Sequence, residues 1–208
     1  GTGLGMSIVK ALLDKMGGKV LDVQKAHLVE LIQAAEKVVE EEKSDEYYDN
    51  TQILLKAIKV GEAAIELRDS CSEAEEVYEG RDVNEDWASY VNTAADLDNQ
   101  LDAAVELLKD TECTVTELNL MKKSVDEAKD ALLGIWDKLI VTIKPTDKEM
   151  LGAEDKVTIS SEFDDLQIRY TIDGNEPTWF SEEYTEPFAM TRSKETVKAA
   201  LFLGRRQM

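Results

Sequence analysis

Between residues 22 and 139, apolar positions recur at steps of three and four residues, with charged residues between them. In an α-helix this spacing gathers the apolar side chains on one face, so the pattern predicts four amphipathic helices. The first stripe joins Leu28, Leu31, Ile32, Ala35, Val38 and Val39, and the second joins Ile53, Leu54, Ala57, Ile58, Gly61, Ala64 and Ile65. The third joins Trp87, Tyr90, Val91, Ala94, Leu97, Leu101, Ala104, Val105 and Leu108, and the fourth joins Leu118, Met121, Val125, Ala128, Leu132 and Ile135.

Two short motifs indicate where helices begin. Thr114 with Glu117 forms an S/T-x-x-E capping box ahead of the fourth stripe, and Ser72 with Glu75 repeats the pattern. Amphipathic helices joined by short polar turns must bury their stripes against one another. The sequence therefore predicts an antiparallel helical bundle over residues 22–139.

After Val141 the hydrophobic period changes from that of a helix to two. Leu166, Ile168, Tyr170 and Ile172 alternate with polar residues, as in a strand with one buried face, and the turn dipeptide Asp173-Gly174 follows. Further short strands are predicted at Val157 with Ile159, and at Val197 with Ala199 and Leu201. We expect a small β-sandwich over residues 141–208, joined to the bundle through Lys144-Pro145-Thr146, and hence an α+β multidomain chain.

Composition and charge narrow the choice of partners. The 208 residues include 24 Lys and Arg against 44 Asp and Glu, a formal net charge of −20. Such a surface repels nucleic-acid phosphates and anionic lipids, so neither nucleic acid nor a membrane is an expected partner. The sequence holds no apolar run of 18 residues and no signal peptide pattern. Because the chain begins at Gly1, we expect a fragment or a processed product.

The residues that usually carry catalysis or metal binding form no recognisable site. The two cysteines, Cys71 and Cys113, allow one disulfide at most and supply no metal framework, and His27 has no second ligand at metal-binding spacing. Carboxylates such as those of Glu40, Glu41, Glu42, Asp164 and Asp165 are interpreted as solvated charges. We therefore expect no catalytic, cofactor or metal site in this chain.

Four segments near the carboxyl end carry a family resemblance. They are Val157-Thr158-Ile159-Ser160, Ile168 to Thr178 with its D-G-x-x-P-T turn, Tyr184-Thr185-Glu186-Pro187-Phe188, and Thr196-Val197-Lys198-Ala199. Together they resemble the chitobiase/β-hexosaminidase C-terminal domain over residues ~155–204. The resemblance implies an immunoglobulin-like β-sandwich attached behind the catalytic domain of secreted bacterial glycoside hydrolases. It implies an accessory role without catalysis, with a catalytic domain of the parent protein as a partner.

Two further resemblances lie earlier in the chain. The helical region, most clearly residues 101–108 and 116–133, resembles the FIVAR helical module of bacterial surface and sugar-degrading proteins. The glycine-rich segment of residues 1–20, with Gly1-Thr2-Gly3-Leu4-Gly5 and later Gly17-Gly18, resembles the lid of a histidine kinase ATP-binding domain. The family's upstream magnesium and adenine motifs are missing, so we do not expect ATP binding by this chain alone.

Three aromatic residues after the Pro177-Thr178 turn are the candidate ligand-binding residues: Trp179, Phe180 and Tyr184. Flat rings beside Glu182 and Glu183 are typical of a surface that stacks on sugars. The alternative is that these rings close the sandwich core or pack on a neighbouring domain.

We therefore expect a non-catalytic accessory region of a carbohydrate-active protein, used for spacing, docking or weak glycan contact. The resemblance implies an extracellular or cell-surface location. Two alternatives stay open. One is the end of a histidine kinase ATP-binding domain with a regulatory extension, and the other is an artificial join of unrelated pieces.

Overall fold

A computed structural model describes residues 22–41, 48–82, 84–146, 155–190 and 196–208. The glycine-rich segment of residues 1–20, with its kinase-like motif, lies outside the described residues. Contacts divide the chain into two compact units: residues 1–82 with 94–131, and residues 83–93 with 132–208. We call these the helical unit and the β unit and describe each by itself.

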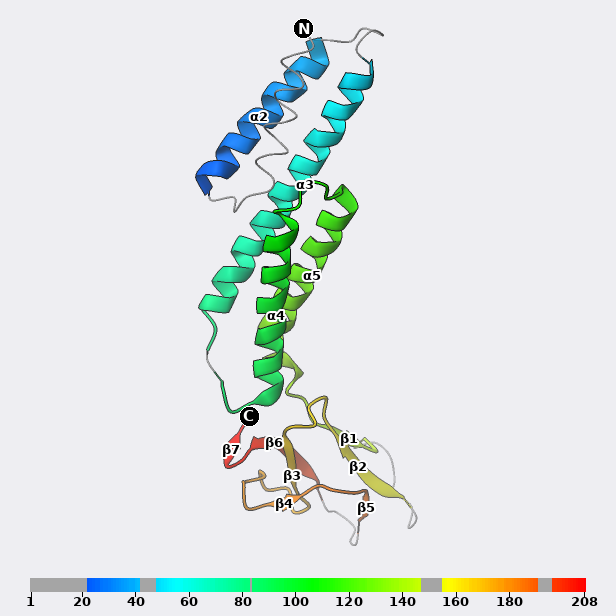
Figure 1. The fold of residues 1–208 in the computed structure, drawn as a ribbon. Helices are drawn as coiled ribbons and strands as arrows, with labels where there is room; N and C mark the ends of the chain where they lie inside the picture. Colours follow the sequence, from blue (N-terminus) through cyan, green and yellow to red (C-terminus); the bar gives the residue numbers. More distant parts are fainter. Residues whose placement is uncertain (1–21, 42–47, 83, 147–154, 191–195) are drawn as a thin grey trace. The chain divides into compact units, whose positions relative to one another are not determined.

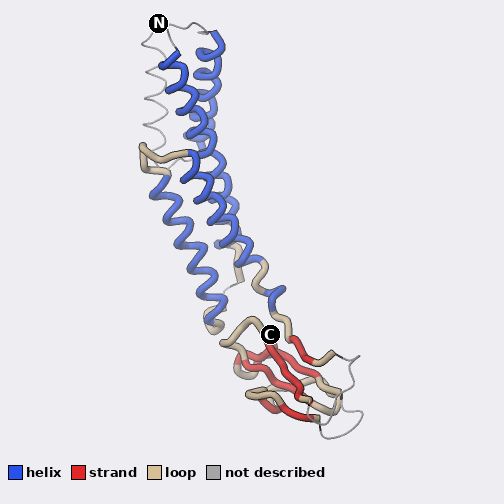
Figure 2. The backbone as a smooth tube through the Cα atoms, turned by 90° about the vertical axis from the view of Figure 1, so that its right-hand side faces the viewer, coloured by secondary structure: helices blue, strands red, loops and turns tan. Residues whose placement is uncertain are grey.

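The helical unit is built from antiparallel helices. They are α2 (Asp22–Glu41), α3 (Tyr48–Glu79), α4 (Ala88–Leu107) and α5 (Val115–Leu133). Figures 1 and 2 show α3 alongside α2 in its first half, and alongside α4 and α5 in its second half. The predicted helical bundle is confirmed, and residues 88–93 of α4 belong to the β unit.

Helix α3 packs against different helices along its length. Its first half packs Leu54, Ala57 and Ile58 against Ile32 and Ala35 of α2. The apolar stripe continues without a break through buried Leu67, Cys71 and Ala74. The helix start predicted at Ser72 is therefore wrong, because Ser72 lies inside a helix whose buried face runs past it.

The start of α5 follows the predicted capping box. The backbone N–H of Thr114 donates to Glu117 Oε2 at 2.8 Å, and the backbone N–H of Glu117 donates to Thr114 Oγ1 at 3.3 Å. These bonds satisfy donors that an uncapped helix end leaves exposed. Hydrogen bonds from the Thr114 side chain and backbone hold the pKa of Glu117 below its usual value.

The β unit contains two antiparallel sheets, which confirms the predicted sandwich. One has the order β1 (Thr142–Lys144), β2 (Lys156–Ser160), β5 (Phe188–Ala189). The other has the order β4 (Glu182–Glu183), β3 (Gln167–Thr171), β6 (Lys198–Leu203), β7 (Arg206–Gln207). Lys144 pairs with Thr158 of β2, so the predicted linker at Lys144 is wrong: this residue ends a strand.

Alternation along the strands fills the sandwich core. Val157 and Ile159 of β2 are buried together with Tyr170 of β3. The predicted apolar face of β3 stops at Tyr170, because β3 ends at Thr171 and Ile172 is exposed. Gly174 adopts a φ of 80°, which confirms the turn predicted at Asp173-Gly174.

Residues 83–93 join the β unit through a cluster of aromatic rings. Trp87 has no exposed surface, and its ring centroid lies 5.0 Å from that of Phe163, 5.3 Å from that of Trp136 and 6.1 Å from that of Tyr90. Trp136 begins the short 3-10 helix η2 (Trp136–Lys138). We call Trp87, Tyr90, Trp136 and Phe163 the aromatic cluster.

Asp165 caps the amino end of α4. Its carboxylate accepts the Ser89 backbone N–H at 2.7 Å and the Ser89 hydroxyl at 2.8 Å. Burial alone would raise the pKa of Asp165, but the hydrogen bonds from Ser89 outweigh it and hold the pKa below its usual value. Asp165 therefore has a structural partner, whereas the sequence analysis interpreted it as a solvated charge.

Candidate functional site

Trp179 and Phe180 lie at the centre of a tight turn that starts at Thr178 and ends at Ser181. The Ser181 backbone N–H donates to the Thr178 carbonyl at 2.9 Å. The two ring centroids are 3.6 Å apart, with 36° between the ring planes. Phe180 is 78% exposed, whereas Trp179 is half-buried. We call this pair the aromatic platform.

Several hydrogen bonds hold the turn in place. Arg169 of β3 donates from Nη1 to the Ser181 carbonyl at 2.8 Å, and the Thr178 backbone N–H donates to Ser181 Oγ at 2.9 Å. Phe180 donates its backbone N–H to Thr178 Oγ1 at 3.3 Å. A surface fixed in this way loses little conformational entropy on binding a ligand.

A second segment reaches the aromatic platform from the turn between β6 and β7. The guanidinium carbon of Arg205 lies 4.5 Å from the centroid of the Trp179 ring, a cation–π contact. Gly204 precedes it with a φ of 60°, the left-handed conformation that glycine adopts without strain. Since Phe180 and Arg205 both lie against Trp179, the ring most open to a ligand is that of Phe180.

Tyr184 packs against other residues than Trp179 and Phe180 do. Its ring centroid is 6.3 Å from that of Tyr170 and 6.4 Å from that of Phe188, and it packs against the sandwich core. Its backbone N–H donates to the Ile168 carbonyl at 2.8 Å. Of the three aromatic residues singled out in the sequence, Trp179 and Phe180 come together, while Tyr184 has the packing role considered as the alternative.

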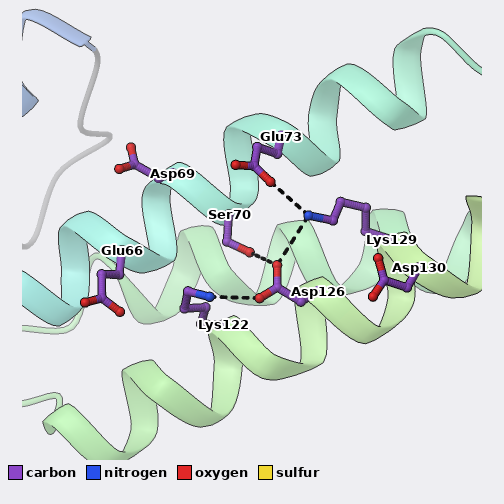
Figure 3. A pocket seen from close by; sticks show the side chains of 8 residues that line it. All are labelled: Glu66, Asp69, Ser70, Glu73, Lys122, Asp126, Lys129 and Asp130. Carbon is purple, nitrogen blue, oxygen red and sulfur yellow. Dashed lines mark hydrogen bonds and ion pairs between the residues drawn. The ribbon is translucent and has the colours of Figure 1, made fainter.

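A charged groove lies between α3 and α5 in the helical unit (Figure 3). It has a volume of ≈ 430 Å³ and is lined by Glu66, Asp69, Ser70, Glu73, Lys122, Asp126, Lys129 and Asp130. The Ser70 hydroxyl donates to Asp126 Oδ1 at 2.5 Å, and Lys122 donates to Asp126 Oδ2 at 2.9 Å. Lys129 bridges the helices, 2.9 Å from Glu73 Oε2 and 3.5 Å from Asp126 Oδ1.

The electrostatics of the charged groove favour ion pairing over acid catalysis. Burial would raise the pKa of Asp126, but hydrogen bonds from Ser70 and Lys122 outweigh it and hold the pKa below its usual value. A glycosidase general acid needs a raised pKa, so Asp126 does not have the character of such an acid. Ion pairs between the side chains that line the groove instead link α3 to α5, an arrangement that the sequence alone did not indicate.

Neither cysteine has the character of a reactive thiol. Cys71 and Cys113 are free and buried, and burial raises the pKa of Cys71 to about 11 and raises that of Cys113 as well. A high pKa keeps the thiol protonated and unreactive. His27 lies in α2, but its side chain is outside the described ones.

The described part of the chain has neither a metal cluster nor a membrane-crossing helix. No group of three or more His, Cys, Asp or Glu side chains is arranged there to hold a metal ion. No described helix combines the length and the apolar character needed to cross a bilayer.

Comparison with known protein families gives a match at the carboxyl end of the chain. Residues 147–208 match the family model of the Chitobiase/beta-hexosaminidase C-terminal domain. The resemblance stated from the sequence is confirmed for this region, and the domain type is a non-catalytic appendage in hexosaminidase-like proteins. No curated protein and no solved structure matches the chain.

Proposed function

We propose that this chain is a non-catalytic accessory region of a secreted carbohydrate-active protein, and that the aromatic platform makes weak contact with glycan. The family match over residues 147–208 supports an accessory region of a glycoside hydrolase. The parent catalytic domain is the implied partner. Secretion and glycan contact are parts of this proposal.

The observation that carries the glycan contact is the exposure of Phe180 on a fixed turn. A ring that is 78% exposed offers a flat apolar face, and the C–H face of a sugar ring packs well on such a surface. The Trp179 ring packs against that of Phe180, with the two ring centroids 3.6 Å apart. One exposed ring gives little binding energy, so we expect a Kd on the order of a millimolar, or about −4 kcal/mol.

The helical unit would act as a spacer or docking element for the parent protein. Its charged groove is lined by side chains that pair with one another, and these ion pairs stabilise helix packing rather than recognise a substrate. Its FIVAR character stays a prediction. The histidine kinase alternative depends on residues 1–20, which lie outside the described residues, and no observation favours it.

The test is a titration of the full chain with oligomers of N-acetylglucosamine, followed by chemical shift changes. Phe180→Ala should abolish the response and change the free energy of unfolding by less than about 0.5 kcal/mol, because the ring is mostly exposed. Ile172→Ala removes another exposed apolar side chain of the β unit and serves as the matched control. A response that survives Phe180→Ala would refute the proposed site.

A further inference from the structure

We propose that Arg205 makes the aromatic platform selective for acidic glycans, those whose sugars carry a carboxylate or a sulfate. This inference rests on the proposed function and goes further by naming the class of glycan. It depends on the position of Arg205, on the lack of a carboxylate partner for its guanidinium in the described part of the chain, and on the chemistry of acidic sugars.

Arg205 is held against Trp179, the ring on which Phe180 packs, with no carboxylate partner in the ranges that the structure describes. Its guanidinium carbon lies 4.5 Å from the Trp179 centroid, and Trp179 lies 3.6 Å from Phe180. Among the described residues no carboxylate pairs with Arg205. The N–H donors of a guanidinium point outward in the plane of the group. When the group stacks on an aromatic face, these donors therefore stay available to an anion.

Three other cations of the β unit, Arg169, Lys198 and Arg206, have polar side-chain partners. Arg169 lies 3.5 Å from Glu183 Oε2, and Lys198 is paired with Glu176. Arg206 donates from Nη2 to Asn84 Oδ1 at 2.7 Å. Arg205 has no such partner among the described residues, and it stacks on Trp179, whose ring packs against that of exposed Phe180. The net charge of the chain is −20.

An acidic sugar presents both features that this arrangement can bind. Its C–H face can stack on Phe180, and its carboxylate or sulfate can accept two parallel N–H bonds from a guanidinium. Phe180 and Arg205 both contact the Trp179 ring, at 3.6 Å and 4.5 Å from its centroid, so an oligosaccharide that extends past Trp179 can contact both. A neutral sugar would use only the stacking contact.

The net charge of the chain opposes anion binding at long range, so the experiment is done at physiological ionic strength. The Debye length there is about 8 Å, which screens the distant carboxylates but leaves a direct contact with Arg205. The full chain is titrated with an oligogalacturonate and with a neutral N-acetylglucosamine oligomer of the same length. The dissociation constants are read from chemical shift changes.

We expect the oligogalacturonate to bind about three- to tenfold more tightly than the neutral oligomer, as one charge-assisted contact allows. Arg205→Gln should remove this advantage and leave the neutral oligomer unaffected. Arg206→Gln removes the same charge one residue away and should keep the advantage. Phe180→Ala should weaken the binding of both oligomers.

Three results would overturn the inference: equal affinity for the two oligomers, equal losses in the Arg205→Gln and Arg206→Gln variants, or acidic binding that survives Phe180→Ala. The second result would mean that only bulk charge matters. If the neutral oligomer binds through Phe180 and the acidic one binds no better, the proposed function stands and the selectivity fails. If neither oligomer binds, both fail.

Discussion

The helical unit and the β unit stabilise themselves with different side chains. The helical unit buries aliphatic and small residues, and its largest fully buried side chains are Leu67, Leu97, Leu118 and Val125. The β unit relies on aromatic rings, with Trp87 at the centre of the aromatic cluster and Tyr170 stacked on Phe188 at 4.6 Å. All three tryptophans of the chain, Trp87, Trp136 and Trp179, lie in the β unit.

The polar groups of the two units differ in the same way. In the helical unit, Lys122 and Lys129 are paired with carboxylates across and along the helices, and their pKa values are raised by these partners. In the β unit, Phe180 and Arg205 are exposed, and Arg205 has no carboxylate partner among the residues described there. The ion pairs between α3 and α5 thus hold the helical unit together, whereas the proposed ligand contact lies in the β unit.

The largest expected effect is the fall in stability of the β unit when the aromatic cluster is disrupted. Trp87→Ala should lower the free energy of unfolding of the β unit by about 3 to 5 kcal/mol, because a fully buried ring leaves a cavity among its partners. Tryptophan fluorescence reports this unit alone, since Trp136 and Trp179 remain there, whereas far-ultraviolet circular dichroism follows mainly the helices. Trp87→Phe keeps part of the ring contact and should lose less. An unchanged fluorescence transition would show that the cluster does not hold the β unit together.

The matching change in the helical unit is Leu67→Ala. Leu67 has no exposed surface, and truncation of a buried leucine costs about 2 to 5 kcal/mol. We expect the transition followed by circular dichroism to move and the fluorescence transition to stay, if the two units unfold separately. Leu120→Ala, at a leucine that is 60% exposed, is the control and should change stability by less than about 0.5 kcal/mol. Equal shifts in both signals would show that the chain unfolds as one unit.

A smaller effect is expected at the cap of α4. Asp165→Ala should lower the stability of the β unit by about 1 kcal/mol, the usual value of a lost carboxylate cap. The control is Asp164→Ala, at the exposed neighbouring carboxylate, and its stability should match that of the unchanged protein.

The stability that the Asp165 cap contributes should also depend on pH, and it should decrease in acid. Because the folded pKa of Asp165 is lowered, its contribution is full above the unfolded value of about 4 and is lost as the pH falls through the folded pKa. Denaturation followed by fluorescence at neutral and at acid pH should show the stability difference shrinking in acid. A difference that stays constant into strong acid would contradict the role of the charged carboxylate.

The sequence by itself determined the elements that depend on local chemistry. The stripe positions Leu97, Leu101 and Ala104 are buried because helical periodicity fixes which side chains share a face. Thr114 with Glu117 and Gly174 acted as predicted, since a capping box and a left-handed glycine turn need only a few neighbouring residues. The family match confirmed the resemblance over the strands of the β unit. Each of the motifs behind it is a short run of consecutive residues, which can be recognised without knowing the tertiary structure.

Only the tertiary structure decided which distant side chains meet. Phe163 packs on Trp87, Asp165 caps Ser89, and Arg205 lies over Trp179, although no periodicity links these positions along the chain. The same holds for Tyr184, whose ring joins the core because β3 and Phe188 surround it, while Phe180 a few residues earlier stays exposed. A sequence pattern specifies the face of its own element, whereas the neighbour of that face is set by how the elements fold against one another.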